Sequence, residues 1–274
     1  MPPASAAGAC NNEITMSTNT SPALSAAQID AFEKDGFLIL PRLVPAADCE
    51  LMAATTNTHL AQAVAPLEYE SEVGYAGAPK SLDSAGGRTA RRLRNAYQRD
   101  GSYRAWATNP QLVAMLELLL GEAVCLTLSH HNCVMTKHPH FGTATGWHRD
   151  IRYWSFPRNE LISVWLALDS ENANNGGLRF IPGSHRFDIK PEQMDELDFL
   201  RPEVAANQAL FAQGKSVELQ QGDVVFFHSG LFHAAGRNNT DTVKESVVFA
   251  YHGKSNPPVP GSRSAASQDI LLSS

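Results

Sequence analysis

The chain has 274 residues, 43% of them hydrophobic and 18% charged, so it can bury a substantial core in one large domain or two small ones. Its formal net charge of −6 argues against nucleic acid or an anionic membrane as a partner, since both select for a basic surface. Four cysteines without CxxC spacing are typical of a reducing compartment. We therefore expect a soluble cytoplasmic protein that binds a small molecule.

The first part of the chain predicts a tail followed by a mainly helical flank. Residues 1–24 are rich in Ala, Ser, Thr and Asn, can bury little, and are expected to be disordered. Residues 25–274 are expected to form a single domain, with residues 25–121 as the helical flank. Capping residues, Gly and Pro set the expected boundaries. These predict a helix from Ser25 to Gly36, a strand over 37–40, a helix from Pro45 to about Val64, and a helix in "NPQLVAMLELLLG" that ends at Gly121.

Residues 66–102 combine a loop-like stretch, "GYAGAPKSLDSAGG", with a run of arginines. Runs of like charge usually lie on a solvated surface, so we expect a solvated helix face here, with an anion-binding wall as the alternative. The arginines of this run are Arg88, Arg91, Arg92, Arg94 and Arg99.

From residue 122 onward, short runs rich in β-branched and aromatic residues alternate with turn residues. This pattern of short strands and turns predicts a sandwich or barrel and not a parallel sheet. A polar, partly helical insertion over 186–214 is long enough to be a lid or side wall. The expected strands cover 123–128, 131–137, 145–149, 161–169, 177–181, 216–219, 223–228 and 245–252.

The stretch "GWHRDIRYW" places two metal-ligating side chains two residues apart. In a strand, His148 and Asp150 project to the same side, whereas Arg149 points away. One imidazole and one carboxylate are two of the three ligands of the two-His, one-carboxylate face that holds non-haem Fe(II). An H-x-D triplet alone is a weak motif, and a single histidine is more often a hydrogen-bonded core residue, so a third ligand is needed.

The third ligand is expected in "QGDVVFFHSGLFHAAGRNNTD", which offers His228 and His233. We prefer His233, because the small residues that follow it, Ala234, Ala235 and Gly236, let the backbone approach a bound group closely.

Five segments carry a resemblance to a known family: "GWHRDIRYW", "LISVWLAL", "NNGGLRFIPGSH", "QGDVVFFHSGLFHAAGRNNTD" and "KESVVFAYH". In this order they resemble the phytanoyl-CoA dioxygenase family of Fe(II)- and 2-oxoglutarate-dependent oxygenases, over about Ala27 to Arg263. The resemblance implies a mainly β fold with flanking helices and a double-stranded β-helix core, jelly-roll or cupin-like, over 122–263. It also implies His148, Asp150 and His233 as iron ligands, 2-oxoglutarate and O2 as cosubstrates, and Trp165 beside the 2-oxoglutarate.

The chain departs from the family at one position. The family usually has an arginine eleven residues after the distal histidine, where it binds the far carboxylate of 2-oxoglutarate, and this sequence has Lys244 there. Lysine lacks the bidentate fork but can neutralise a carboxylate, so Lys244 is the first candidate, with Arg237 and Arg263 as rivals. Asn132 and Thr145 could bind the carboxylate nearer the metal, or could equally satisfy their own loop backbone.

The resemblance implies hydroxylation of an unactivated C–H bond, with release of succinate and CO2. Asp150 disfavours halogenation, because halogenating relatives have a small residue at that position. The alternative is a cupin-like metal-binding isomerase, or a noncatalytic ligand-binding barrel, that does not use 2-oxoglutarate; the missing arginine favours it. The small-molecule substrate is expected to contact Arg94, Tyr153 and Arg263, and the two arginines suggest an anionic group on it.

Overall fold

The structure is a computed structural model that describes residues 23–272. The expected tail, residues 1–24, lies outside the described residues except for Ala23 and Leu24. Leu24 is buried in the largest hydrophobic cluster, so the packed part of the chain begins slightly before the expected boundary. Among residues 23–272, no helix is both long and apolar enough to cross a bilayer.

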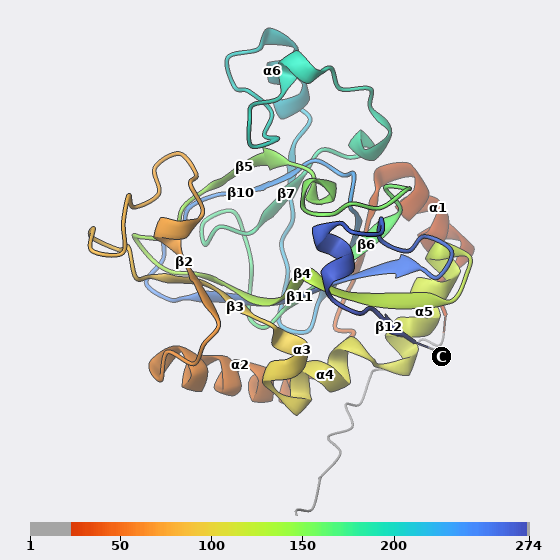
Figure 1. The fold of residues 1–274 in the computed structure, drawn as a ribbon, viewed down its shortest axis with the longest axis horizontal. Coiled ribbons are helices and arrows are strands. Elements are labelled where there is room, and N and C mark those ends of the chain that lie inside the picture. The colour runs from red at the N-terminus through yellow and green to blue at the C-terminus, as the bar shows by residue number, and fades with distance from the viewer. Residues whose placement is uncertain (1–22, 273–274) are drawn as a thin grey trace, which may run out of the picture.

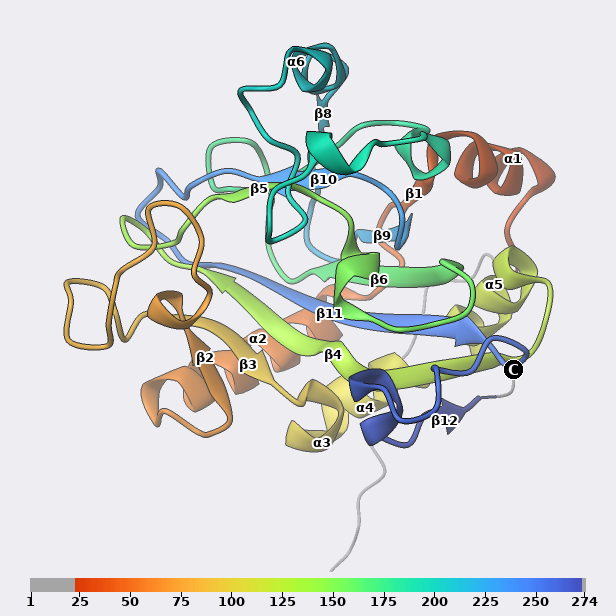
Figure 2. The same cartoon turned by 45° about the horizontal axis from the view of Figure 1, so that its top comes forward.

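Two antiparallel sheets pack face to face, which confirms the mainly β fold expected for the second half (Figures 1 and 2). The large sheet consists, in spatial order, of β1 (Phe37–Leu40), β9 (Val224–His228), β6 (Leu161–Ala167), β11 (Lys244–Gly253), β4 (Val124–Lys137), β3 (Ala90–Arg94) and β2 (Leu67–Tyr69), and β12 (Ile270–Leu271) also pairs with β4. The small sheet consists of β5 (Thr145–His148), β10 (His233–Ala235), β7 (Leu178–Phe180) and β8 (Lys215–Ser216).

Helices cover the face of the large sheet that points away from the small sheet (Figure 1). They include α2 (Ala46–Ala61), α3 (Ala96–Arg99), α4 (Gly101–Ala107) and α5 (Pro110–Leu120), whereas α1 (Ala26–Asp35) precedes β1. Every residue of β6 is buried, because Val164 packs toward the helices while Trp165 packs toward the small sheet. This double burial explains why the β6 sequence is apolar without alternation.

The expected helix boundaries are confirmed where caps define them. The Ser25 side chain accepts a hydrogen bond from the Gln28 amide in a capping box, and Gly36 ends α1 in a left-handed conformation with φ 79°. Asn109 caps α5 and Gly121 ends it in the same way.

The arginine run was not expected to be a strand, and this prediction was wrong. Residues 90–94 form β3, which pairs with β4 so that Arg92 lies opposite Met135. The pairing directs Arg91 and Arg92 into the interior of the molecule, whereas Arg88 stays exposed and bonds Asp83. The strand was not expected because a sequence rich in arginine rarely forms a buried strand.

The two strands expected over 123–128 and 131–137 are one long strand, β4, interrupted by a bulge. Asn132 pairs with Phe249 of β11 and Thr127 pairs with the next residue, Ala250, so residues 128–131 have no partner in β11. His130 in this segment has φ 64°. We call residues 128–131 the β4 bulge; bulges commonly re-aim side chains beside functional sites.

The expected insertion over 186–214 lies over the small sheet (Figure 1). It contains η4 (Pro191–Gln193) and α6 (Ala205–Phe211), and it follows η3 (Ser184–Arg186). The Leu200 amide donates to the Trp147 carbonyl at 2.8 Å, and Phe211 stacks on the Trp147 ring. The insertion is thus a side wall, as expected, and it brings Phe199 beside His148.

Candidate active site

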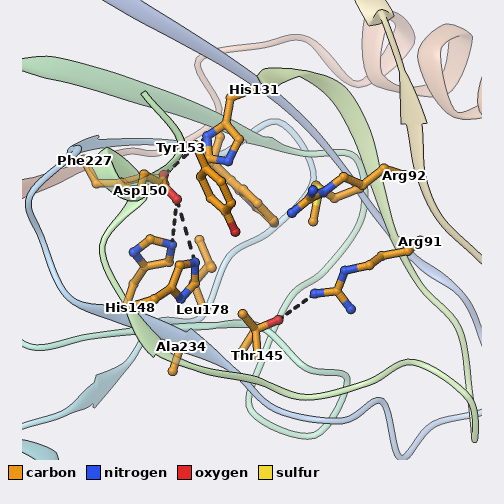
Figure 3. A pocket seen from close by; sticks show the side chains of 14 residues that line it. Arg91, Arg92, His131, Thr145, His148, Asp150, Tyr153, Leu178, Phe227 and Ala234 are labelled. Carbon is orange, nitrogen blue, oxygen red and sulfur yellow. Dashed lines mark hydrogen bonds and ion pairs between the residues drawn. The ribbon is translucent and has the colours of Figure 1, made fainter. Parts of the chain in front are cut away.

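Three metal-ligating side chains meet between β5 and β10 (Figure 3). His148 ends β5, His233 begins β10, and the two residues are partners in the antiparallel pairing. Asp150 begins the short helix η2 (Asp150–Tyr153), directly after the strand. All three are buried, and one ligand atom from each lies within 4.8 Å of the other two.

The hydrogen bonds of the two histidines fix which ring nitrogen is free. Nδ1 of His148 lies 2.9 Å from the Gly146 carbonyl, and Nδ1 of His233 lies 3.1 Å from the Leu231 carbonyl. A carbonyl only accepts, so Nδ1 carries a hydrogen on each ring, and in the neutral form of the ring Nε2 presents a lone pair. Burial, followed by the neighbouring His233, holds the pKa of His148 well below its usual value, so this imidazole is neutral.

One carboxylate oxygen of Asp150 has a hydrogen-bond partner, and the other has none among the described residues. Oδ2 accepts from the Ser163 hydroxyl at 2.9 Å and lies 3.3 Å from Nδ1 of His131. Oδ1 is buried without a hydrogen-bond partner among the described residues, 3.4 Å from Nε2 of His233 and 3.8 Å from Nε2 of His148. Although burial raises the pKa of Asp150, the histidines around it, His131 first, hold that pKa below its usual value.

In their neutral forms, the two imidazoles therefore direct lone pairs at a point that Oδ1 of Asp150 also faces. Such an arrangement is unfavourable in a dry interior unless a cation occupies the point. The donor set is the one that suits non-haem Fe(II) and leaves further coordination positions open. The residues present therefore fit an iron ion.

A cavity of about 50 Å³ extends from the three ligands into the space between the sheets. Ala234 and Ala235 line it, as expected from the small residues after His233, and Trp165 lines it from β6. Arg91 and Arg92 also line it (Figure 3). The other lining residues are His131, Met135, Thr145, Tyr153, Leu178 and Phe227.

A cluster of buried charges adjoins this cavity. Arg91 bonds Glu70 at 3.0 Å, and Lys244 bonds Glu171 at 2.9 Å. Lys137 lies directly opposite Lys244 in the β4–β11 pair, and its ammonium group donates only to the Thr143 carbonyl within the described part of the chain. We call these five charged residues the charge cluster; it holds three cations and two anions.

Burial, followed by the positive charges of Arg91 and Lys244, lowers the pKa of Lys137 well below its usual value. A buried cation without a carboxylate is costly, and an added anion would relieve that cost.

The expected cosubstrate residues divide into three groups. Trp165 and Thr145 line the cavity, and the Thr145 hydroxyl accepts from Arg91 at 2.8 Å (Figure 3). Lys244 lies with its ammonium group 5.0 Å from the centre of the Trp165 ring, and both donate to Glu171. Asn132 does not reach the cavity: its side chain accepts from the Tyr97 amide and donates to Gln98 on the opposite face of β4.

The remaining expected residues lie elsewhere. His228, the rival third ligand, packs against His185 with the two rings tilted and accepts from the Gly230 amide, outside the group of three. Arg237 lies against Gly77. Of the three substrate candidates, Tyr153 lines the cavity, whereas Arg94 and Arg263 line a second hollow next to it.

Sequence reasoning missed several residues that surround the site. Glu171 follows β6 in a turn and gives no local signal, and Lys137 gains its role only from its position opposite Lys244. His131 could have been noticed because it is a polar residue inside an apolar strand, two positions before Cys133. Arg91 and Arg92 belonged to the run assigned to solvent.

The fold and these three side chains define a β-sandwich protein with a candidate two-histidine, one-carboxylate metal centre. Residues 32–246 match the family model described as phytanoyl-CoA dioxygenase (PhyH). The chain therefore belongs to the phytanoyl-CoA dioxygenase family.

Among curated relatives, the rat peroxisomal phytanoyl-CoA dioxygenase (Rattus norvegicus) is 26% identical over 91% of this chain and 74% of its own length. The human protein (Homo sapiens) is 25% identical over 79% of this chain, which spans only 64% of that relative. Ectoine dioxygenase from Stutzerimonas stutzeri is 22% identical over 84% of this chain and 77% of its own length.

Solved structures share the fold. EctD from S. alaskensis with bound Fe superposes with a TM-score of 0.73 at 20% identity, over 96% of this chain and 92% of that chain. The epimerase SnoN, in complex with Fe3+, alpha ketoglutarate and nogalamycin RO, gives a TM-score of 0.67 at 20% identity, over 90% and 93% of the two chains. These neighbours confirm the expected jelly-roll, cupin-like fold.

Metal binding should stabilise the protein through the three ligands. At a free Co(II) concentration 100 times its Kd, the free energy of unfolding should rise by about 2.7 kcal/mol, which calorimetry detects as a higher Tm. His233→Ala should abolish this metal-induced rise. His228→Ala is the matched control and should keep it; an equal loss in both variants would contradict the assignment of His233.

Proposed function

We propose that this protein is an Fe(II)- and 2-oxoglutarate-dependent dioxygenase that hydroxylates an unactivated C–H bond of a small molecule and releases succinate and CO2. The observation that carries the proposal is the convergence of two histidine Nε2 atoms and the unpartnered Oδ1 of Asp150 at one end of a cavity. Membership of the phytanoyl-CoA dioxygenase family supports it.

Iron, when bound with 2-oxoglutarate and O2, supplies the oxidising chemistry. The protein side chains orient the metal ligands and limit the access of water to the metal position. Ser163 and His131 hold Oδ2 of Asp150, which leaves Oδ1 directed at the metal position. The backbone carbonyls that accept from the two Nδ1 atoms hold the imidazole rings in a single orientation. Leu178 and Phe227 line the cavity with apolar surface and limit the entry of water.

We assign the far carboxylate of 2-oxoglutarate to the charge cluster. Lys137 has no carboxylate partner in the cluster, and burial lowers its pKa, so an added carboxylate would favour its charged form and balance the cluster. Lys244 stays our candidate for direct contact, and Arg91 is a second donor, because its Nε is buried without a partner in the described part of the chain. Thr145 and Trp165 would flank the cosubstrate from the cavity wall.

The alternative function is a metal-binding isomerase or a noncatalytic barrel that does not use 2-oxoglutarate. The observation in its favour is the ion pair between Lys244 and Glu171, which already neutralises the residue at the family's arginine position. Binding of 2-oxoglutarate separates the two proposals, since only the oxygenase needs it.

We also propose a cytoplasmic location. The three cysteines among the described residues, Cys49, Cys125 and Cys133, are free thiols. Burial raises the pKa of Cys49 to about 12 and that of Cys133 to about 11, so both stay protonated. Free, unreactive thiols are typical of proteins in reducing compartments.

Replacing Lys137 should raise the stability of the protein and weaken its affinity for 2-oxoglutarate. Lys137→Met removes a buried amino group whose charged form lacks a carboxylate partner, so the Tm of the metal-free protein should rise. The Kd of 2-oxoglutarate, measured by isothermal titration of the Mn(II)-loaded protein, should increase at least about tenfold. Lys254→Met, at an exposed position, is the control. An unchanged Kd in Lys137→Met would contradict the assignment of the carboxylate to the charge cluster.

The reaction is tested by product analysis. The protein is incubated aerobically with Fe(II), 2-oxoglutarate and a panel of small molecules, and succinate and the candidate products are measured by mass spectrometry. We expect one class of compounds to yield succinate together with a product that has gained one oxygen atom. Asp150→Ala, which loses one ligand, should give neither. Metal and 2-oxoglutarate binding without succinate formation from any compound would favour the alternative.

A further inference from the structure

A second hollow opens where the β4 bulge leaves a gap in the large sheet. On the edge of β4 away from β11, residues 133–135 pair with β3, and residues 125–126 pair with β12. The bulge, residues 128–131, lies between these two pairings, and Figure 2 shows β3 and β12 beside different parts of β4. The gap therefore leaves the bulge residues without a neighbouring strand on this side of β4.

This hollow has a volume of about 320 Å³. Ser129 and His130 of the bulge line it, together with Arg94 at the end of β3 and Arg263 at the start of η5 (Arg263–Ala266). We call it the bulge pocket. Its two arginines come from distant parts of the chain, and the fold brings them together around one concave surface.

The bulge pocket carries positive charge without a matching carboxylate. Within residues 23–272, the ion pairs of arginines involve Arg88, Arg91, Arg92, Arg158 and Arg201, and so include neither Arg94 nor Arg263. The contrast with Arg92 is direct: it lies two residues before Arg94 on the same strand and bonds Glu68 at 3.0 Å. The pKa of His130 reflects these surroundings: burial, and then the positive charge of Arg263, lower it to about 3.

The rings of His130 and Tyr153 lie between the bulge pocket and the metal cavity. The His130 ring stacks on Tyr153 with 5.4 Å between centroids, and Tyr153 lines the metal cavity. Along β3, Arg92 lines the metal cavity and Arg94 lines the bulge pocket, at positions about 7 Å apart. A molecule that extended from the metal centre to the bulge pocket would therefore pass Tyr153.

We propose that the bulge pocket binds the anionic group, a carboxylate or a phosphate, of the substrate that is oxidised at the metal centre. This inference rests on the proposed function for the oxidation step, but the binding itself does not depend on metal. The guanidinium groups of Arg94 and Arg263 each present paired N–H donors that match the oxygens of such an anion. The rest of the substrate lies against Tyr153 and places its C–H bond in the metal cavity.

Isothermal titration of the metal-free protein at low salt tests the proposal, with inorganic phosphate and hexyl phosphate as probes. Both should bind the wild type, and hexyl phosphate should bind at least about tenfold more tightly, because its alkyl chain contacts Pro66 and Leu128, which line the pocket. Arg94→Gln and Arg263→Gln should each weaken both probes at least about tenfold. Arg88→Gln, at an exposed arginine of the same run, is the matched control and should change neither.

Nuclear magnetic resonance of the His130 ring locates the binding, since its signals should shift with each probe in the wild type and not in Arg94→Gln. The Arg94 side chain makes no hydrogen bond within the described residues, so its replacement should leave the near-ultraviolet circular dichroism unchanged. Absence of phosphate binding in the wild type would overturn the proposal.

Equal affinity for both probes would also overturn it, because the pocket would then be a site for a free anion. The two proposals fail in distinguishable ways. Loss of probe binding in a protein that forms succinate overturns only the anionic substrate, whereas probe binding in a protein that never forms succinate overturns only the dioxygenase.

Discussion

The pairing of β5 with β10 is the constraint on which the site depends. It sets His148 opposite His233 across two short strands, and Asp150 follows two residues after His148, at the start of η2. The insertion over 186–214 then covers β5 from outside through the hydrogen bond between Leu200 and Trp147. A one-residue slip in this register would turn one histidine away from the other, so the ladder itself specifies the metal geometry.

Charged side chains lie in three regions from the metal position to the surface. Next to the metal position, the negative charge of Asp150 and the Nε2 atoms of two histidines favour a cation. Further along the cavity, the charge cluster holds Lys137, whose charged form lacks a carboxylate partner, and this favours an anion. Beyond Tyr153, Arg94 and Arg263 line the bulge pocket without carboxylate partners. A metal ion, a dicarboxylate and an anionic substrate would complement these three regions in turn.

Much of the fold and the metal centre could be predicted from the sequence, because their signals are local. Ser25 and Gly36 mark a helix by capping, and apolar runs mark the sandwich strands. The H-x-D motif identified two residues that meet, but not through strand alternation as expected: β5 ends at His148, and Asp150 lies in the short helix η2. The choice of His233 over His228 rested on the small residues after it, and the structure brings His233, not His228, to Asp150.

The surroundings of the site could not be predicted, because they depend on long-range pairing. Arg91 and Arg92 enter the cavity only because β3 pairs with β4, and Lys137 matters only because it lies opposite Lys244. Asn132 does not reach the cavity because it alternates with Cys133 and Met135, which face the small sheet, so its amide points to the helices as Val134 does. Which of the two faces of β4 lines the cavity is decided by the pairing and packing of distant strands, and not by the local sequence.

The measurement that tests the central claim most directly is anaerobic titration of the purified protein with Fe(II) and then with 2-oxoglutarate, followed by visible absorption. The account predicts a weak charge-transfer band that grows with 2-oxoglutarate and saturates at one equivalent per protein chain. Iron binding with no band at any 2-oxoglutarate concentration would contradict the account, and the three ligands would then belong to a metal site with a different function.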